Sequence, residues 1–447
     1  MDYKLQIFGV KPHLQMGSLD DGSTRQPDNK SLFTMDKDVE GTKSVDAVEK
    51  GTFSVSSPVV DRNMIRNGVY KSIKTVIFSN KLNLLMPFGP LAILVQNLSG
   101  HNGWVFLLSL MGTAPLAQRL GYITEQLAFY TGPTVGGLLN ATFGNATELI
   151  VSIYALKSGM IHVVQRSLLG SILSNMLLVL GCSFFFGGLV LKQQAFTKAT
   201  AIVNAGLLLM AVMALLLPSV LHNTHTEVHF GKSELALSRF SSCVMLLAYA
   251  VSLVFQLKTQ KDLYVPLNEE ENKNENSDDP IEGPEVSKCE AFIWLAIITL
   301  CTAVLSDYLV DAMEGASAAW NMPIAFVSTI LPPIGGNAAA LTSCIMFAMK
   351  DKLDMSLGVA IGSSTQISMF VLPFCVLVGW IIGSPMDLNF QLFETAALFI
   401  TIIVVSLFLL EGTSNYFKGL MLILCYLIVA ASFYMHQDSP DDKEMTT

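Results

Sequence analysis

The stretch that decides the fold runs from Gly132 to Leu149 and reads Gly-Pro-Thr-Val-Gly-Gly-Leu-Leu-Asn-Ala-Thr-Phe-Gly-Asn-Ala-Thr-Glu-Leu. It consists almost wholly of small and apolar residues. Glu148 is the only formal charge between Glu125 and Lys157. An acid near the centre of a bilayer costs on the order of 3 kcal/mol on insertion scales. The stretch therefore indicates a membrane span with one carboxyl group that needs a partner.

Part of this stretch occurs twice in the chain. The Gly-Asn-Ala of 144–146 recurs 192 positions later at 336–338, and the Gly-Ser of 170–171 recurs at 362–363. The second copy lies five predicted spans after the first, and because five is odd the two copies have opposite orientations in the bilayer. Inverted repeats of this kind build transporters whose substrate binds near the midplane, where the repeats meet.

The composition supports a membrane setting. Of the 447 residues, 51% are hydrophobic and only 14% are charged, against roughly 25% charged in ordinary globular chains. The mean hydropathy is +0.50. The net charge of -9 excludes a basic nucleic-acid-binding domain. Seven cysteines without a Cys-x-x-Cys pair argue against a disulfide scaffold.

Charge-free windows of about 20 residues predict the spans. We expect an all-α polytopic membrane protein with about 11 transmembrane helices, one extra N-terminal helix plus two inverted five-helix repeats. The expected centres lie near residues 90, 111, 144, 179, 210, 249, 300, 335, 368, 402 and 427.

The remaining segments set the expected domains. Residues 1–75 form a polar tail, 82–257 carry the first six spans with the first repeat, and 258–290 form an acidic linker. Residues 291–436 carry the last five spans, and 437–447 form a short tail. The bias of Lys and Arg places the amino-terminal tail and the linker in the cytosol and the last residues on the opposite side. An acidic linker is usually only solvated; a low-affinity cation-gathering loop is the alternative.

The repeated motifs resemble a known family. Residues 132–149 are similar to the first signature repeat of the cation/proton exchanger (CAX) family, within the calcium/cation antiporter superfamily. Residues 336–339 and 356–366 resemble its second repeat, and the resemblance spans about Lys71 to His436. Members with an acidic loop and a regulatory amino-terminal tail are vacuolar exchangers of plants. The resemblance implies that cytosolic Ca²⁺, and in some members Mn²⁺, enters an acidic lumen in exchange for protons, without a cofactor.

A hard divalent cation takes about six to eight oxygen ligands, and the repeats offer carboxylate, amide and hydroxyl oxygens. The candidate cation ligands are Glu148, Asn145, Asn337, Ser171, Asn175, Ser363 and Gln366. Ser171 and Asn175 are four residues apart and share a helical face. For the polar residues next to the motifs, hydrogen bonding between helices is the alternative. For Glu148 the alternative to cation binding is a buried carboxyl group that neighbouring amides hold in the protonated form.

Four glycines accompany these ligands and allow close helix approach or an unwound backbone. They are Gly144, Gly336, Gly170 and Gly362, and helix packing alone is the alternative reading for them. Removal from water favours a protonated carboxyl, whereas a bound dication favours the charged form. Glu148 can therefore hold either a metal ion or a proton, and rocking of one repeat against the other would alternate access.

One departure from the family pattern matters. Members read Gly-Asn-Ala-Ala-Glu-His in the second repeat, but Ala340 and Leu341 stand where the Glu and His are expected. A dication held by a single carboxylate keeps uncompensated charge in a low dielectric, so we expect weak exchange or none. A transport-deficient homologue that acts as a regulatory or oligomerisation partner is the alternative.

A second cluster of potential metal ligands consists of His222, His225 and His229. Histidines in a loop are usually only exposed to solvent; a site that senses Zn²⁺ or Mn²⁺ is the alternative. An intramembrane enzyme is disfavoured, because the sequence has no His-Glu-x-x-His and no Gly-x-Ser-x-Gly. The expected partners are divalent cations, protons and membrane lipid, without nucleic acid. A homo- or hetero-oligomer with related exchangers is a further expectation.

Overall fold

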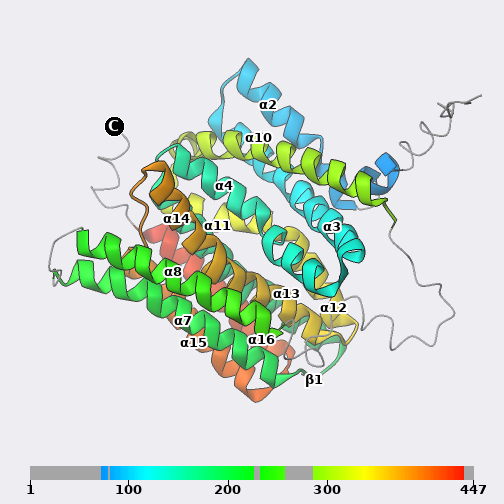
Figure 1. Ribbon diagram of the computed structural model, residues 1–447, viewed down its shortest axis with the longest axis vertical. Helices are drawn as coiled ribbons and strands as arrows, with labels where there is room; N and C mark the ends of the chain where they lie inside the picture. The colour runs from blue at the N-terminus through cyan, green and yellow to red at the C-terminus, as the bar shows by residue number, and fades with distance from the viewer. Residues whose placement is uncertain (1–71, 79–80, 226–231, 257–284, 437–447) are drawn as a thin grey trace, which may run out of the picture. The chain divides into compact units, whose positions relative to one another are not determined.

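The computed structural model describes residues 72–78, 81–225, 232–256 and 285–436. The tail up to residue 71, the linker from 257 to 284 and residues 437–447 lie outside the described part of the chain. All described residues belong to one unit, Val60–Thr447. Figure 1 shows that this unit is built almost wholly of helices.

The helices fall into two sets. The first set contains η1 (Lys81–Leu85), α2 (Phe88–Leu98), α3 (Asn102–Phe143), α4 (Ala146–Lys157), α5 (Ile161–Leu173), the π-helical η2 (Ser174–Val179), α6 (Leu180–Val190), α7 (Lys198–Asn223) and α8 (Lys232–Val254). The second set contains α10 (Lys288–Trp320), α11 (Ile324–Gly336), α12 (Ala338–Met349), α13 (Leu353–Gln366), the π-helical η4 (Ile367–Val371), α14 (Leu372–Ile382), α15 (Leu392–Glu411) and α16 (Tyr416–Met435). Two short strands, β1 (Gln194–Ala195) and β2 (Thr413–Ser414), pair antiparallel.

Length and hydropathy identify seven membrane-crossing helices among the described residues, and up to nine if two bent pairs each count as one span. The bent pairs are Ser72–Phe78 with Lys81–Leu98, at 83°, and Ile324–Gly336 with Ala338–Met349, at 54°. Every predicted centre except residue 144 lies within a helix. The expected all-α polytopic class is confirmed.

The helix α3 differs from expectation, because it is continuous from Asn102 to Phe143 where two separate spans were predicted. Its 42 residues extend about 63 Å, roughly twice the thickness of a hydrocarbon core. The polar residues near 118–125 do not interrupt it, because Gln, Arg and Glu are good helix formers. The chain bends instead at Gly144–Asn145, and α4 follows.

The two repeats match helix by helix. Both α4 and α12 are 12 residues long and follow a Gly-Asn break. The next spans, Ile161–Val190 and Leu353–Ile382, are both 30 residues long and each contains a π-helical segment. All these bounds are related by the offset of 192 found in the sequence. The repeat is therefore a property of the fold as well as of the motifs.

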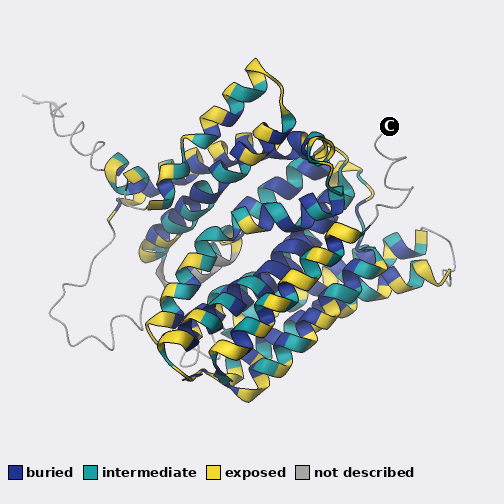
Figure 2. Cartoon of the chain, turned by 180° about the vertical axis from the view of Figure 1, so that it is seen from behind, coloured by how far each residue is buried: buried dark blue, intermediate teal, exposed yellow. Residues whose placement is uncertain are grey.

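These two matched spans form the centre of the unit. Within their apolar windows, 83% and 61% of residues are buried, against 39% or less in the other five spans. Figure 2 shows exposed residues along the outer helices and buried residues along the inner ones. Beside this centre α3 and α10 pack closely along each other (Figure 1).

One predicted boundary was wrong. The charge-free window of the fourth predicted span begins at Ser167, which would place Gly170–Ser171 at its opening. The span starts instead at Ile161, and the pair lies inside it. The charge-free window started too late because it excluded Arg166, which is buried and paired with Glu394 at 2.9 Å between Nε and Oε1. A charged side chain that is paired with an opposite charge is tolerated within a membrane span. Arg166 therefore does not mark the end of this span.

Candidate cation site between the repeats

Glu148 is the third residue of α4, directly after the break at Asn145. The unpaired N–H groups and the dipole at a helix N-terminus favour a carboxylate at this position. The carboxyl group faces the second repeat: a Cβ atom added to Gly336 would lie 3.3 Å from Glu148 Oε1. The break in α3–α4 and the break in α11–α12 therefore meet at this carboxyl.

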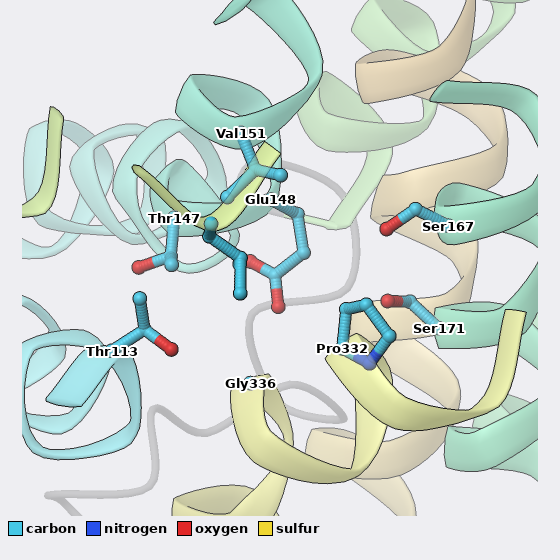
Figure 3. A pocket seen from close by; sticks show the side chains of 9 residues that line it. Thr113, Thr147, Glu148, Val151, Ser167, Ser171, Pro332 and Gly336 are labelled. Carbon is cyan, nitrogen blue, oxygen red and sulfur yellow. The ribbon is translucent and has the colours of Figure 1, made fainter. Parts of the chain in front are cut away.

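A small pocket surrounds the Glu148 side chain (Figure 3). It offers about 30 Å³ to the centres of water molecules, enough for about two waters. Its lining combines hydroxyls from three helices with apolar side chains and the second-repeat break: Thr113, Thr147, Glu148, Val151, Ser167, Ser171, Leu309, Pro332 and Gly336. One carboxylate and several hydroxyls are the kind of oxygen donors that a hard cation takes.

Four predicted ligands form a hydrogen-bonded network that joins the repeats. Asn145 Nδ2 donates to Gln366 Oε1 at 2.8 Å, and Ser363 Oγ donates to Asn145 Oδ1 at 2.8 Å. Asn175 Nδ2 donates to Ser363 Oγ at 3.0 Å. All four side chains are buried or partly buried. The network fixes the break at Asn145 against α13 and against the π-helical segment of the first repeat.

The remaining predicted ligands are placed differently. Ser171 lines the pocket with Glu148. Asn337 is 5% exposed at the break between α11 and α12, and within the described part of the chain its Nδ2 has no hydrogen-bond partner. Ala340 is the third residue of α12, the position that Glu148 holds in α4. The structural match thus assigns Ala340 to the place of a second acid.

Sequence reasoning did not include three of the pocket's hydroxyls, those of Thr113, Thr147 and Ser167. Ser167 lies four residues before Ser171, and this spacing places both on one face of α5. Thr113 comes from α3, and its Oγ1 donates to Leu110 O at 2.8 Å, which leaves oxygen lone pairs free to accept. No local pattern indicates Thr113, because its approach to Glu148 depends on how α3 packs.

The histidine cluster is only partly described. His222 Nδ1 lies 2.8 Å from Glu234 Oε2, so a carboxylate is its partner here. His229 lies outside the described residues. Among the described residues no three His, Cys, Asp or Glu side chains group around a metal-sized space. The metal reading of these histidines stays a prediction, and His222 contacts the side chain of Glu234 here.

The chain matches the family model of the sodium/calcium exchanger protein over residues 101–258 and 290–435. It belongs to that family. Vacuolar cation/proton exchanger 2 of Arabidopsis thaliana is 66% identical over 422 residues, which are 94% of this chain and 96% of the relative. Vacuolar cation/proton exchanger 2 of Oryza sativa subsp. japonica is 67% identical over 373 residues, 83% of this chain and 85% of the relative. The resemblance to the cation/proton exchangers is confirmed.

Solved structures of the family share the fold. Native YfkE is 32% identical, with a TM-score of 0.67, and the match covers 79% of this chain and all of that one. A structure of an H⁺/Ca²⁺ exchanger, CAX, has a TM-score of 0.61 over 79% of this chain and 91% of that one, at 12% identity, and supports the fold alone. Two solved structures thus share the helical architecture of this chain.

Proposed function

We propose that this chain is a secondary antiporter of the vacuolar membrane that exchanges cytosolic Ca²⁺, or another divalent cation such as Mn²⁺, for lumenal protons. The observation that carries the proposal is the Glu148 carboxylate in a hydroxyl-lined pocket where the broken helices of both repeats meet. The family match and the relatives named vacuolar cation/proton exchangers support it. YfkE, which is 32% identical to this chain, is a Ca²⁺/H⁺ antiporter.

In this mechanism Glu148 alternates between a proton and the cation. The pocket removes the carboxyl from bulk water, which favours the protonated form, whereas a dication favours the charged form. The hydroxyls of Thr113, Ser167 and Ser171 complete the oxygen shell. The residues Asn145, Asn175, Ser363 and Gln366 hold the break in place, and their oxygens are proposed ligands when their mutual hydrogen bonds open. Asn337, whose Nδ2 has no partner among the described residues, offers its side-chain oxygen from the second repeat.

The domain layout is proposed with the mechanism. The polar tail and the acidic linker lie in the cytosol, where the tail regulates the rate, and the last residues lie in the lumen. Alternating access arises as one repeat rocks against the other. The ions are transported substrates, and the proposal needs no resident cofactor.

Ala340 favours a second candidate, a transport-deficient homologue that acts as a regulatory or oligomerisation partner. With one carboxylate the site leaves part of the dication's charge uncompensated, so exchange is expected to be slow. Proton-driven uptake of ⁴⁵Ca²⁺ into vesicles that contain the purified chain separates the two. Uptake above that of protein-free vesicles, abolished when the proton gradient is collapsed, supports the exchanger. Uptake equal to protein-free vesicles favours the partner role.

A further inference from the structure

The short connection between α6 and α7, residues 191–197, is fixed against one end of α12. Its strand β1 pairs with β2, which lies in the turn between α15 and α16. Gln194 of β1 is 2% exposed, and its Nε2 donates to Ala348 O of α12 at 2.7 Å and to Asp351 Oδ1, just after α12, at 3.2 Å. Because α6 belongs to the first repeat and α12 to the second, these hydrogen bonds join the two repeats.

The connection between α14 and α15 is the counterpart of this segment, and the offset of 192 relates Gln194 to Met386. This counterpart lies against the end of α4, since a Cβ atom added to Gly379 would lie 3.0 Å from Met386 Cβ and 3.6 Å from Leu156 Cδ2. Likewise, a Cβ atom added to the equivalent Gly187 would lie 2.6 Å from Gln194 Oε1. A methionine side chain has no hydrogen-bond donor, so Met386 cannot make the bonds that Gln194 makes.

A second difference between the repeats lies two residues after the ends of α4 and α12, where Gly159 and Asp351 are equivalent. Both have a left-handed backbone, with φ of 79° and 61°, which glycine adopts freely and aspartate only occasionally. Asp351 N donates to Ala348 O at 3.3 Å. In the first repeat, Gly159 N donates to Leu156 O at 3.1 Å, so the helix ends are alike in their backbone. They differ in the side chains of Gln194 and Asp351, which bond to each other.

This contact is placed to act on the cation site through α12. The helix has 12 residues, begins directly after the break at Asn337 and ends beside Gln194. Its length is about 18 Å, and rigid secondary elements of this kind carry coupling between distant sites. A constraint on the last turn of α12 therefore limits the movement of the break at its first turn.

The buried amide of Gln194 is bonded through only one of its two polar atoms. Within the part of the chain that the structure describes, Gln194 Oε1 has no hydrogen-bond partner. A buried acceptor without a partner costs free energy, and such a group in a native structure calls for an explanation. The contact is therefore better suited to being made and broken than to stabilising a single conformation.

We propose that Gln194 is a positioning residue that forms, with Asp351, a latch between the repeats. The latch holds the last turn of α12 against the connection after α6, and it opens when α12 moves to alternate access to the cation site. Neither residue lines the Glu148 pocket, so the latch sets how fast α12 moves and leaves the affinity for the cation unchanged. The inference rests on the proposed function, which supplies this movement.

Amide hydrogen exchange of the full-length chain in lipid nanodiscs tests the latch without any transport. Gln194→Met introduces the residue of the other copy, which has a similar size and no donor. We expect amide exchange in peptides that cover residues 345–353 to become about tenfold faster, and that of the equivalent residues 153–161 to stay unchanged. Gln193→Met, at the exposed neighbouring position, is the matched control and should behave as the unmodified chain does.

Changes at the exposed Asp351 separate the hydrogen bond from packing. Asp351→Asn keeps a side-chain oxygen that accepts from Gln194, so it should preserve slow amide exchange in residues 345–353. Asp351→Gly introduces the residue of the first repeat, fits the left-handed backbone and removes the acceptor, so amide exchange there should become about threefold faster. In the Gln194→Met background the same glycine should add nothing, because the bond is already lost.

Transport kinetics distinguish a latch from a merely structural contact. Proton-driven ⁴⁵Ca²⁺ uptake is measured in the unmodified chain and in the Ala340→Glu chain. In both, Gln194→Met should raise the maximal rate about threefold and leave KM within about twofold, whereas damage to the fold would lower the rate. If no variant takes up Ca²⁺, the proposed function fails, and amide exchange still decides whether the latch exists.

Unchanged amide exchange of residues 345–353 in Gln194→Met would overturn the proposal, and so would equal acceleration of residues 153–161. A maximal rate that stays the same or falls would also overturn it, because Gln194 would then be a structural contact only. If Gln194→Met does not fold, the two Asp351 variants decide: equal amide exchange in Asp351→Gly and Asp351→Asn would exclude the latch.

Discussion

The two repeats have the same helix arrangement but differ in the side chains at their helix breaks. In the first repeat, Asn145 hydrogen-bonds across to Gln366 and Ser363, and Glu148 follows at the third position of α4. In the second repeat, Asn337 has an unpartnered Nδ2 within the described residues, and Ala340 occupies the third position of α12. Equal helix lengths and breaks therefore do not require equal chemistry.

This difference indicates that the break geometry depends on the Gly-Asn pair and on packing, because it persists where the acid is missing. A buried unpartnered donor costs about 1–3 kcal/mol, and Asn337 Nδ2 is such a donor in the second repeat. In the proposed site the first repeat supplies the charge through Glu148, and the second supplies Gly336 and the side chain of Asn337. The predictions below test this division.

Replacement of Glu148 has the largest expected effect. Glu148→Gln keeps the shape of the side chain but removes the charge and the exchangeable proton. Because attraction between charges in a water-poor site is worth several kcal/mol, the loss should exceed tenfold. Proton-driven ⁴⁵Ca²⁺ uptake measures it, both in the unmodified chain and in an Ala340→Glu background where exchange should be stronger.

Glu125→Gln on α3 serves as the control for Glu148, because Glu125 lies outside the pocket lining. A well-expressed Glu148→Gln variant that exchanges at the parental rate would show that the first-repeat acid does not carry the cation.

Restoration of the second acid is the next largest effect. Ala340→Glu, alone or with Leu341→His, places a carboxylate at the position equivalent to Glu148. Two carboxylates compensate the charge of a dication, so proton-dependent uptake should rise by about an order of magnitude or more, roughly 1.4 kcal/mol in free energy. The same uptake assay checks it.

Ala339→Glu, one position earlier on α12, is the matched control, since one residue turns the side chain by about 100° around the helix. If the unmodified chain already exchanges robustly and Ala340→Glu adds nothing, another group replaces the missing acid and the two-carboxylate model fails for this protein.

The sequence predicted site residues well where a repeated motif carries them. It failed for features that depend on how distant helices pack. The G-N-A repeat identified the two equivalent segments but left close helix packing and an unwound backbone both open, so the breaks themselves were not predicted. The ligand set contained four residues that meet in one network, Asn145, Asn175, Ser363 and Gln366. The span boundary at Arg166 was missed because its buried partner, Glu394, is 228 residues away. Thr113 was missed for the same reason, since only the packing of α3 brings it to the pocket.

The equivalent glycines of the two repeats sharpen the comparison through stability. A Cβ atom at Gly170 would clash with the backbone carbonyl of Thr329 on α11, whereas a Cβ at Gly362 would meet nothing within 4 Å. Gly170→Ala should destabilise the protein by about 3 kcal/mol, at the upper end for overpacking because backbone yields poorly. Gly362→Ala should be neutral or slightly stabilising, as Ala favours a helix. Thermal unfolding of both variants in one detergent measures the difference, and equal melting temperatures would contradict the close approach of α5 and α11.

The smallest expected effect separates the equivalent serines. Ser363 Oγ donates to Asn145 and accepts from Asn175, whereas Ser171 faces the Glu148 pocket. Each buried hydrogen bond contributes about 0.5–1.5 kcal/mol, so Ser363→Ala should lower the unfolding free energy by about 1–2 kcal/mol. Ser171→Ala should leave stability nearly unchanged and reduce only the protection that added Ca²⁺ gives against unfolding. Ser364→Ala is the control, because Ser364 Oγ donates only to Ala360 O of its own helix in the described network. If Ser171→Ala proved the more destabilising change, the joining network would lie in the second repeat's break, and the division of roles between the repeats would be reversed.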